Sequence, residues 1–396
     1  MVSEVSKLPK RVCMVVHAYY PADETRVKRE AELLVRHGVK VEVICLRKQG
    51  EESRASANGV EILRLPVRRH RGASTVVYIL EYMSFMLLAS FVLIKRSVRR
   101  AYDIVQFHTP PDYIVYAGLG AKLFGSKIVL DMHETMPDLV IDRLKLMRNS
   151  LVLRLVCLSE KLSARFADAV LTVSEPVRKA IEARTGLDNI GIVMNVADES
   201  LFLPKETSSG SDAVSIVYHG MITKSYDLRP VLKAMQIVRQ EIDNFFLDVY
   251  GEGEMLSELK EMAISLKLER HISFRGFIPM EDVAREIQRA DIGVVPVTNS
   301  YYAKFALPTK LLEYARVGIP TLVPRFDTIG AYFSEEMVQS YEPSNVEDLA
   351  RKLGELIHSK KRRDSITLEL AKFARAHSWE MEGETYLGIL GKVTGW

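Results

Sequence analysis

Two segments in the first half of the chain carry side chains that can exchange protons with a substrate. In the segment 131–138, His133 lies between two acids, Asp131 and Glu134, directly after an apolar run. A histidine at the end of a buried strand can donate a hydrogen bond to a substrate hydroxyl or to a developing alkoxide. His108 ends a second apolar run. We therefore predict that His133 and Glu134 are catalytic, with His108 close to the bound substrate.

The cluster around His133 also resembles a weak metal site. A strong zinc motif would carry two histidines on one face of a helix, and the sequence has no such pair in this segment. We therefore predict that the site holds no metal.

The loop 17–26 follows the first apolar run and contains no glycine. A dinucleotide-binding turn needs glycine so that the backbone can approach a pyrophosphate. This absence argues against an NAD or FAD site in the first half. Asp23 and Arg26 are predicted to face the substrate. Asp23 or Thr25 can also cap the following helix, a role compatible with the first and the one that the position of Asp23 favours.

Three segments in the second half are candidates for binding an anion. Gly220 follows an apolar run, and Lys224 can reach a phosphate as a point charge. Gly251 and Gly253 form a short Gly-x-Gly after the next run. Such a pair is weak evidence by itself, because it also serves in tight turns.

The third segment, 306–320, is the most informative. Pro308 suits an early helical position, while Gly318 and Pro320 end the helix. The free N–H groups of Thr309 and Lys310 would favour a diphosphate, and Glu313 could accept hydrogen bonds from a ribose. The alternative is a surface helix with a solvated Lys310–Glu313 pair.

Short β-branched runs alternate with helical patterns along both halves of the chain. These runs are continuously apolar, which is typical of a parallel sheet covered on both faces. In the first half we predict strands at Arg11–His17, Lys40–Leu46, Val60–Leu65, Asp103–Phe107, Lys127–Met132, Ala169–Val173 and Ile190–Met194. In the second half we predict strands at Ala213–Tyr218, Phe245–Tyr250, His271–Arg275, Ile292–Val297 and Pro320–Val323.

The segment 207–212, Thr-Ser-Ser-Gly-Ser-Asp, has the composition of a linker between these halves. We predict two Rossmann-like α/β domains, at residues 1–195 and 196–375. Ligands bind outside the carboxyl ends of the strands in such sheets, so the predicted site is the cleft between the domains.

Composition narrows the class of protein. Of the 396 residues, 47% are hydrophobic and 27% charged, which is ordinary for a globular protein. The net charge of +3 indicates no nucleic-acid partner. The three cysteines are far apart and are typical of free thiols in a reducing compartment. We therefore expect a cytoplasmic location.

The apolar segment Ser74–Ile94 is long enough to suggest a membrane span. Glu81 within it, and strands predicted on both sides, argue against a span. Two interpretations of this segment remain: a helix packed on the sheet, or a helix lying on a membrane surface. Basic clusters near it could contact anionic lipid or could simply be solvated; they are Arg68, Arg69, Arg71, Lys95, Arg96, Arg99, Arg100, Arg143, Lys145, Arg148 and Arg154.

Motifs along nearly the whole chain resemble the retaining glycosyltransferases of family 4, which have the two-domain GT-B fold. In the second half the likeness rests on segments 250–253, 274–279, 290–296 and 310–320. In the first half it rests on segments 23–30, 37–41, 103–112 and 130–138. The last segment, from residue 376, resembles the terminal helix that crosses back onto the first domain in this fold.

The resemblance implies a nucleotide-sugar donor, a glycan or lipid-linked acceptor, retention of configuration, and no metal or other cofactor. It places the donor at Gly220, Lys224, Gly251, Gly253 and the 308–313 segment. It places Asp23, Arg26 and His108 on the acceptor side. An oxocarbenium-like centre and a charged diphosphate leaving group must be stabilised in such a reaction. We expect synthesis of a cell-surface polysaccharide or glycoconjugate, with contact to the inner face of a membrane.

One departure from the family is clear. Family members often carry a pair of glutamates here; Glu313 matches the second, but Phe305 occupies the position of the first. The sequence Pro-Thr-Lys-Leu-Leu-Glu-Tyr resembles a sub-branch that lacks the first acid. A sugar-nucleotide epimerase with the same fold, or a non-catalytic sugar-nucleotide-binding protein, are therefore alternatives.

Overall fold

The structure is a computed structural model that describes residues 8–70, 74–99, 102–147, 149–205, 213–301 and 303–395. The chain forms two compact units, one of Met1–Asn195 with Glu382–Trp396 and one of Val196–Met381. The expected linker 207–212 and the basic residues Arg71, Arg100 and Arg148 lie outside the described residues.

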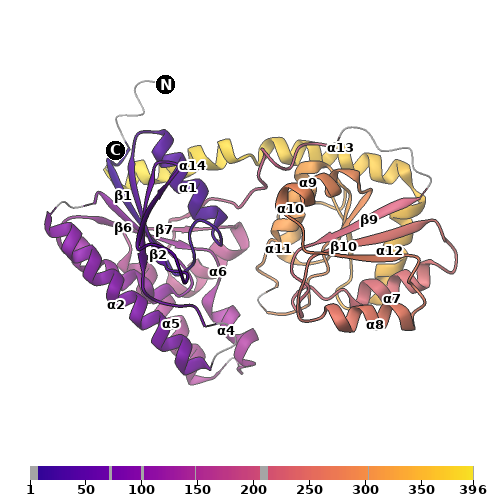
Figure 1. Ribbon diagram of the computed structural model, residues 1–396, viewed down its shortest axis with the longest axis horizontal. Helices are drawn as coiled ribbons and strands as arrows, with labels where there is room; N and C mark the ends of the chain where they lie inside the picture. The colour runs from indigo at the N-terminus through magenta and orange to yellow at the C-terminus, as the bar shows by residue number, and fades with distance from the viewer. Residues whose placement is uncertain are drawn as a thin grey trace. The chain divides into compact units, whose positions relative to one another are not determined.

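The first unit is built on an eight-stranded sheet of order β3-β4-β2-β1-β5-β6-β7-β8 (Figure 1). Its strands are β1 (Arg11–Val16), β2 (Lys40–Leu46), β3 (Arg54–Ala57), β4 (Val60–Leu65), β5 (Ile104–His108), β6 (Lys127–Met132), β7 (Ala169–Thr172) and β8 (Ile190–Ile192). All neighbours pair in parallel except β3 and β4. The continuously apolar runs are therefore the buried parallel strands that the sequence predicts.

Helices and one 3-10 turn connect these strands. They are α1 (Thr25–Arg36), α2 (Thr75–Arg99), η2 (Asp112–Gly118), α3 (Leu119–Leu123), α4 (Met136–Leu144), α5 (Leu151–Phe166), α6 (Glu175–Thr185) and the terminal α14 (Trp379–Val393). From Glu382 onward, α14 belongs to the first unit.

Strand β3 has no counterpart among the predicted strands. Its residues are mostly exposed, so the strand lacks an apolar run. The signal was the turn: Asn58 and Gly59 both have positive φ, 50° and 80°, as a two-residue hairpin turn requires.

Helix α2 has two unlike faces. Phe85, Ala89 and Leu93 are buried, whereas only 22% of the apolar window within Val76–Arg99 is buried. By length and composition this described helix could cross a membrane. However, it connects β4 to β5 within one sheet, which agrees with the sequence argument against a span.

The second unit contains a parallel sheet of order β11-β10-β9-β12-β13-β14. Its strands are β9 (Val214–His219), β10 (Phe245–Tyr250), β11 (Ile272–Gly276), β12 (Ile292–Val294), β13 (Thr321–Pro324) and β14 (Gln339–Tyr341). Its helices are α7 (Arg229–Val238), α8 (Leu256–Ser265), α9 (Met280–Arg289), α10 (Thr309–Val317), α11 (Asp327–Gly330), α12 (Val346–His358) and α13 (Lys360–Ala376). Each unit is thus a doubly wound α/β domain, as predicted.

Candidate active site

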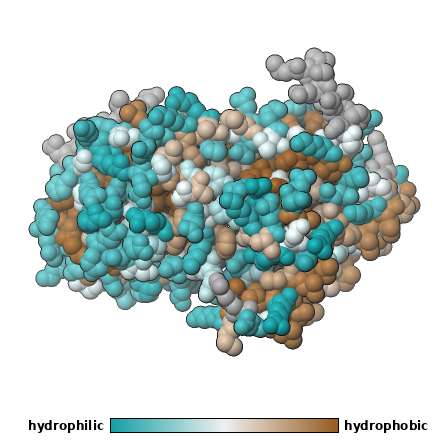
Figure 2. Space-filling model, turned by 180° about the vertical axis from the view of Figure 1, so that it is seen from behind, coloured by the Kyte–Doolittle hydropathy of each residue, from teal (hydrophilic) through white to brown (hydrophobic). Residues whose placement is uncertain are grey.

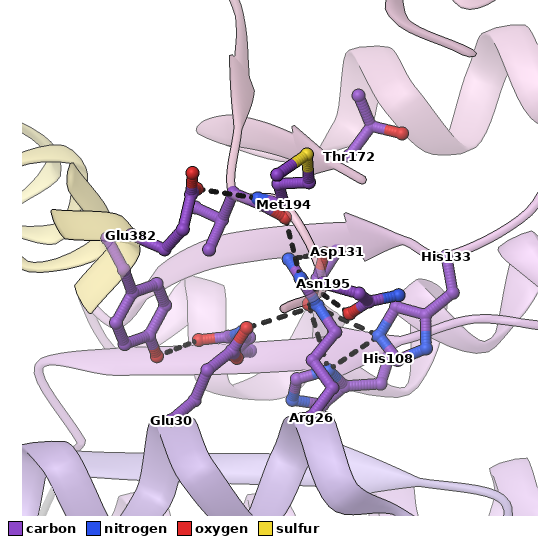
Figure 3. Close-up of polar contacts among 12 residues, drawn as sticks. Arg26, Glu30, His108, Asp131, His133, Thr172, Met194, Asn195 and Glu382 are labelled. Carbon is purple, nitrogen blue, oxygen red and sulfur yellow. Dashed lines mark hydrogen bonds and ion pairs between the residues drawn. The ribbon is translucent and has the colours of Figure 1, made fainter. Parts of the chain in front are cut away.

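The carboxyl ends of β5 and β6 bring two histidines to one aspartate in the first unit (Figure 3). His108 and Asp131 are register partners in the sheet. His108 Nδ1 and His133 Nε2 each lie 3.2 Å from Asp131 Oδ2, and 3.2 Å from each other. His108 and Asp131 are buried, while the His133 side chain is 16% exposed. Of these three side chains, His133 is therefore the one that can reach a substrate.

The buried guanidinium of Arg26 pairs with Asp131 and so positions this cluster. The guanidinium donates Nε–H and Nη2–H to the two Asp131 oxygens, at 2.8 and 3.0 Å. It also donates to the Val193 carbonyl at 2.7 Å and to Asn195 Oδ1 at 3.3 Å. A planar donor fork fits this bidentate geometry. Arg26 is buried, so it supports the site through Asp131 rather than presenting itself to an acceptor.

The network continues from Arg26 to the terminal helix. Arg26 Nε lies 3.1 Å from Glu30 Oε1, and Gln106 Nε2 donates to Glu30 Oε2 at 2.8 Å. The Tyr386 hydroxyl of α14 donates to Gln106 Oε1 at 2.6 Å. Residues from three distant parts of the chain are thus joined by buried hydrogen bonds and by the Arg26–Glu30 ion pair.

Burial and charge set different protonation states within the cluster. Burial lowers the pKa of His108 to about 4, against the pull of Asp131. Burial also acts to lower the pKa of His133, but the charge and hydrogen bond of Asp131 outweigh it, and the pKa is raised. Arg26 and the histidines outweigh burial at Asp131, whose pKa lies well below its ordinary value. An ionised Asp131 therefore favours a protonated, hydrogen-bond-donating His133.

His108, Asp131 and His133 are also close enough for their ligand atoms to share a metal ion. Both oxygens of Asp131 already accept from the Arg26 guanidinium, however. A positive charge beside the carboxylate disfavours a second cation there. The absence of a metal stays a prediction.

The other residues predicted for this site in the first unit differ in exposure and in their place along the chain. Glu134 is half-buried beside His133, and Asp23 is exposed before α1. Glu24 occupies the N-cap position of α1 and makes no side-chain cap bond, so the expected capping by Asp23 or Thr25 is wrong. Asp112 is the first residue of η2, and Pro111 occupies its N-cap position.

In the second unit, a buried lysine and a histidine–glutamate pair lie together at the ends of β9 and α10. His219 Nε2 lies 3.1 Å from Glu313 Oε2. Lys310 Nζ lies 3.6 Å from the centroid of the Tyr226 ring and 5.5 Å from that of Tyr218. Burial lowers the pKa of Lys310 to about 8, only partly offset by Glu313. The alternative of a solvated Lys310–Glu313 pair on a surface helix is therefore wrong.

The predicted glycines shape the loops that enclose Lys310. A Cβ on Gly220 would lie 2.5 Å from Cε of Lys310, and one on Gly251 would lie 1.9 Å from the Gly220 carbonyl oxygen. A Cβ on Gly253 would lie 2.1 Å from the Ile222 carbonyl oxygen. These glycines thus allow the loops after β9 and β10 to pack backbone against backbone.

The remaining residues predicted to bind the donor lie in or just before α10 and in the loop after β9. Pro308 is the N-cap residue rather than a helical one, and Thr309 begins the helix. Gly318 ends it with a φ of 87°, as predicted. Lys224 is exposed in the loop after β9. Phe305 is half-buried ahead of the helix.

Several side chains of these clusters were not singled out from the sequence. They are Glu30, Gln106, Tyr386, His219 and Tyr226. His219 was visible as a polar residue at a strand end. The others gave no local signal, because their partners are far away in the sequence.

Comparison with known proteins defines the class. The family model "Glycosyl transferase 4-like domain" matches residues 24–195, and "Glycosyl transferases group 1" matches residues 202–370. Among solved structures, sucrose-phosphate synthase from Thermosynechococcus elongatus is 14% identical, covers 97% of this chain and 99% of its own, and has a TM-score of 0.75. Anabaena HepE in complex with UDP is 13% identical, with coverages of 96% and 100% and a TM-score of 0.71. The chain therefore belongs to the GT-B glycosyltransferases of the family 4 type.

Two curated relatives match parts of the chain. The amylovoran biosynthesis glycosyltransferase AmsK of Erwinia amylovora is 28% identical over 102 residues, 26% of this chain and 25% of that protein. The chitobiosyldiphosphodolichol beta-mannosyltransferase of Debaryomyces hansenii is 21% identical over 295 residues, 67% of this chain and 62% of that protein. The chain thus spans less than two thirds of the length of either relative.

Proposed function

We propose that this protein transfers a sugar from a nucleotide-sugar donor to a glycan or lipid-linked acceptor, with retention of configuration and without a metal. The observation that carries the proposal is His133, which is partly exposed and held by the buried Asp131. The raised pKa of His133 favours an imidazolium that donates to a sugar hydroxyl or to the developing charge.

The donor half of the proposal rests on α10. The first N–H groups of this helix and the Lys310 ammonium would bind the diphosphate. Glu313 would accept hydrogen bonds from the ribose, and His219 would position Glu313 through their 3.1 Å contact. The UDP in the HepE structure supports a nucleotide donor. With Phe305 in place of an acid, donor-sugar contacts must come from other groups.

The relatives support the choice of acceptor. AmsK is by its name a glycosyltransferase of amylovoran biosynthesis, and the name of the Debaryomyces hansenii relative contains a diphosphodolichol group. We infer that this protein works in the cytoplasm, at the inner face of a membrane, in synthesis of a cell-surface glycoconjugate.

The test begins with thermal shifts against UDP-, GDP- and ADP-sugars, followed by transfer assays with the donor that binds. His133→Ala should lower transfer by ~10²- to 10⁴-fold, as loss of a proton-transferring group does. Donor affinity should stay unchanged, because the donor residues lie in the second unit. His358→Ala, at an exposed position of α12, is the matched control.

Other outcomes would separate the alternatives. Unchanged transfer by His133→Ala would remove the proposed role. An epimerised sugar formed from the donor alone would favour the epimerase, and donor binding without transfer or hydrolysis would favour a non-catalytic protein. EDTA should leave the rate unchanged, and NMR of the product should show the anomeric configuration of the donor.

A further inference from the structure

Helix α2 exposes a row of large apolar side chains. Val76, Leu80, Leu87, Phe91 and Val98 are between 61% and 67% exposed. A helix on the surface of a water-soluble protein normally turns such residues toward the core. The opposite face of α2 already packs on the unit through Phe85, Ala89 and Leu93, so the exposed row needs another partner.

The exposed apolar row continues onto neighbouring elements. Helix α2 packs against η2 and α3, and α5 packs against η2. These elements add further exposed apolar residues, namely Leu119, Leu123, Phe124, Leu151, Leu155 and Leu158. Figure 2 shows hydrophobic side chains gathered over the part of the first unit that carries α2 and α5. We call this the α2–α5 surface; such a broad apolar area is unusual for a protein without a binding partner.

The exposed charges on these elements have one sign. The acids of α2, η2 and α5 are Glu81, Asp112 and Glu160, and all three are buried. The exposed charged residues include Lys95, Arg99 and Arg154, and no described acid of α2, η2, α3 or α5 is exposed. The surface therefore presents apolar side chains beside positive charge.

We infer that the α2–α5 surface docks on an anionic lipid bilayer, with its apolar side chains among the lipid acyl chains and its basic residues at the phosphates. This combination is the physical signature of a helix lying in the interface plane. A second copy of the chain fits less well, because two equally basic surfaces would repel each other. The inference rests on the proposed function for the membrane location, and it names the surface of the first unit that makes the contact.

Docking through α2 would also place the acceptor side close to the lipid headgroups. The Glu81 carboxylate on the buried face of α2 lies 3.1 Å from His17 Nε2, and it accepts from the His70 backbone N–H at 2.8 Å. His17 directly follows β1, at the same edge of the sheet as His108 and Asp131. A bilayer that holds α2 therefore fixes the loop after β1 near the membrane surface.

The experiment measures co-sedimentation of the full chain with vesicles of phosphatidylcholine alone and with added phosphatidylglycerol. We expect binding to the anionic vesicles that weakens with salt. The double variant Leu87→Glu and Phe91→Glu should lose at least roughly tenfold in partition, since each charge must enter the headgroup region. The matched control, Ile264→Glu with Leu368→Glu, changes equally exposed residues of the second unit and should bind as the wild type does.

A third variant, Lys95→Ala with Arg99→Ala and Arg154→Ala, should lose about fivefold in partition per residue on anionic vesicles. Circular dichroism checks that each variant folds, and light scattering reports the oligomeric state. Absence of wild-type binding at low salt, equal binding by the α2 variant and its control, or a wild-type dimer that Leu87→Glu with Phe91→Glu dissociates would overturn the inference. A transfer assay with a water-soluble acceptor tests the proposed function separately. The Leu87→Glu, Phe91→Glu variant should keep the wild-type rate in this assay.

Discussion

Lys310 and His133 are both withdrawn from water, yet their pKa values move in opposite directions. At His133 the carboxylate of Asp131 lies 3.2 Å away and outweighs burial. At Lys310 the aromatic rings of Tyr226 and Tyr218 surround the ammonium, and the charge of Glu313 does not compensate for burial. An anionic ligand should bind favourably next to such a lysine, because its negative charge stabilises the ammonium form that burial disfavours.

Nucleotide affinity should therefore depend on pH through Lys310. Below about pH 8 the ammonium is already protonated, so binding of the diphosphate costs no proton uptake. As pH rises through about 8, the free protein loses this proton, and affinity should fall by up to about tenfold per pH unit. Isothermal titration with UDP, or with the base identified by the donor panel, measures this dependence.

The Lys310→Met variant should bind the nucleotide weakly, and its affinity should not fall as pH rises through about 8. The exposed Lys304→Met is the control and should keep the wild-type profile. A wild-type affinity that is constant from about pH 7 to about pH 9 would show that Lys310 does not contact the nucleotide.

At the scale of elements, the loops after β9 and β10 depend on one another. The backbone N–H of Gly220 donates to the Tyr250 carbonyl, and that of Ile222 donates to the Glu252 carbonyl, each at 2.9 Å. Gly251 has a φ of 145° and lies against the Gly220 carbonyl. Only a residue without Cβ fits at this position.

Gly251→Ala should destabilise the second unit by roughly 1–3 kcal/mol, because the new methyl group forces the two loops apart. Donor affinity should fall with it, since the same loops enclose Lys310. Gly354→Ala is the matched control, because a Cβ in that position of α12 meets nothing within 4 Å. It should be neutral or stabilising by up to about 1 kcal/mol. Urea denaturation measures both, and equal stability of the two variants would contradict the packing argument.

At the scale of the whole molecule, the first unit is completed by the end of the chain. The buried Tyr386 donates a hydrogen bond to Gln106. Gly383 packs against the Leu33 side chain. Glu382 accepts from the Met194 backbone N–H at 2.7 Å. Hydrogen bonds lead from Tyr386 through Gln106 to Glu30, and the Glu30–Arg26 ion pair connects them to Asp131. The terminal helix therefore supports the position of His133 without touching it.

Truncation after Met381 should destabilise the first unit by on the order of 5 kcal/mol, because Tyr386, Leu387 and Leu390 each bury an apolar side chain. Hydrogen exchange should show lost protection in β5 and β8, and unchanged protection in β9 and β10. Tyr386→Phe, which removes one hydrogen bond, should cost only about 1 kcal/mol. Equal protection of β5 in the truncated and full chains would contradict this role for α14.

The sequence by itself determined the alternation of parallel strands and helices, the polar side chains at the carboxyl ends of the strands, and the helix end at Gly318. These features are local, because a continuous apolar run reports burial on both faces and a glycine reports a left-handed backbone. Short elements such as β3 and β14 carry too few residues for such a pattern.

The tertiary structure alone decided which polar groups meet. Arg26 and Asp131 are 105 residues apart, and Tyr386 and Gln106 are 280 apart. Such pairs depend on strand order and on the return of the chain end to the first unit, and no local periodicity encodes either. For the same reason only the structure showed that α2 leaves its apolar face exposed: hydropathy reports that a side chain avoids water, but not which neighbour covers it.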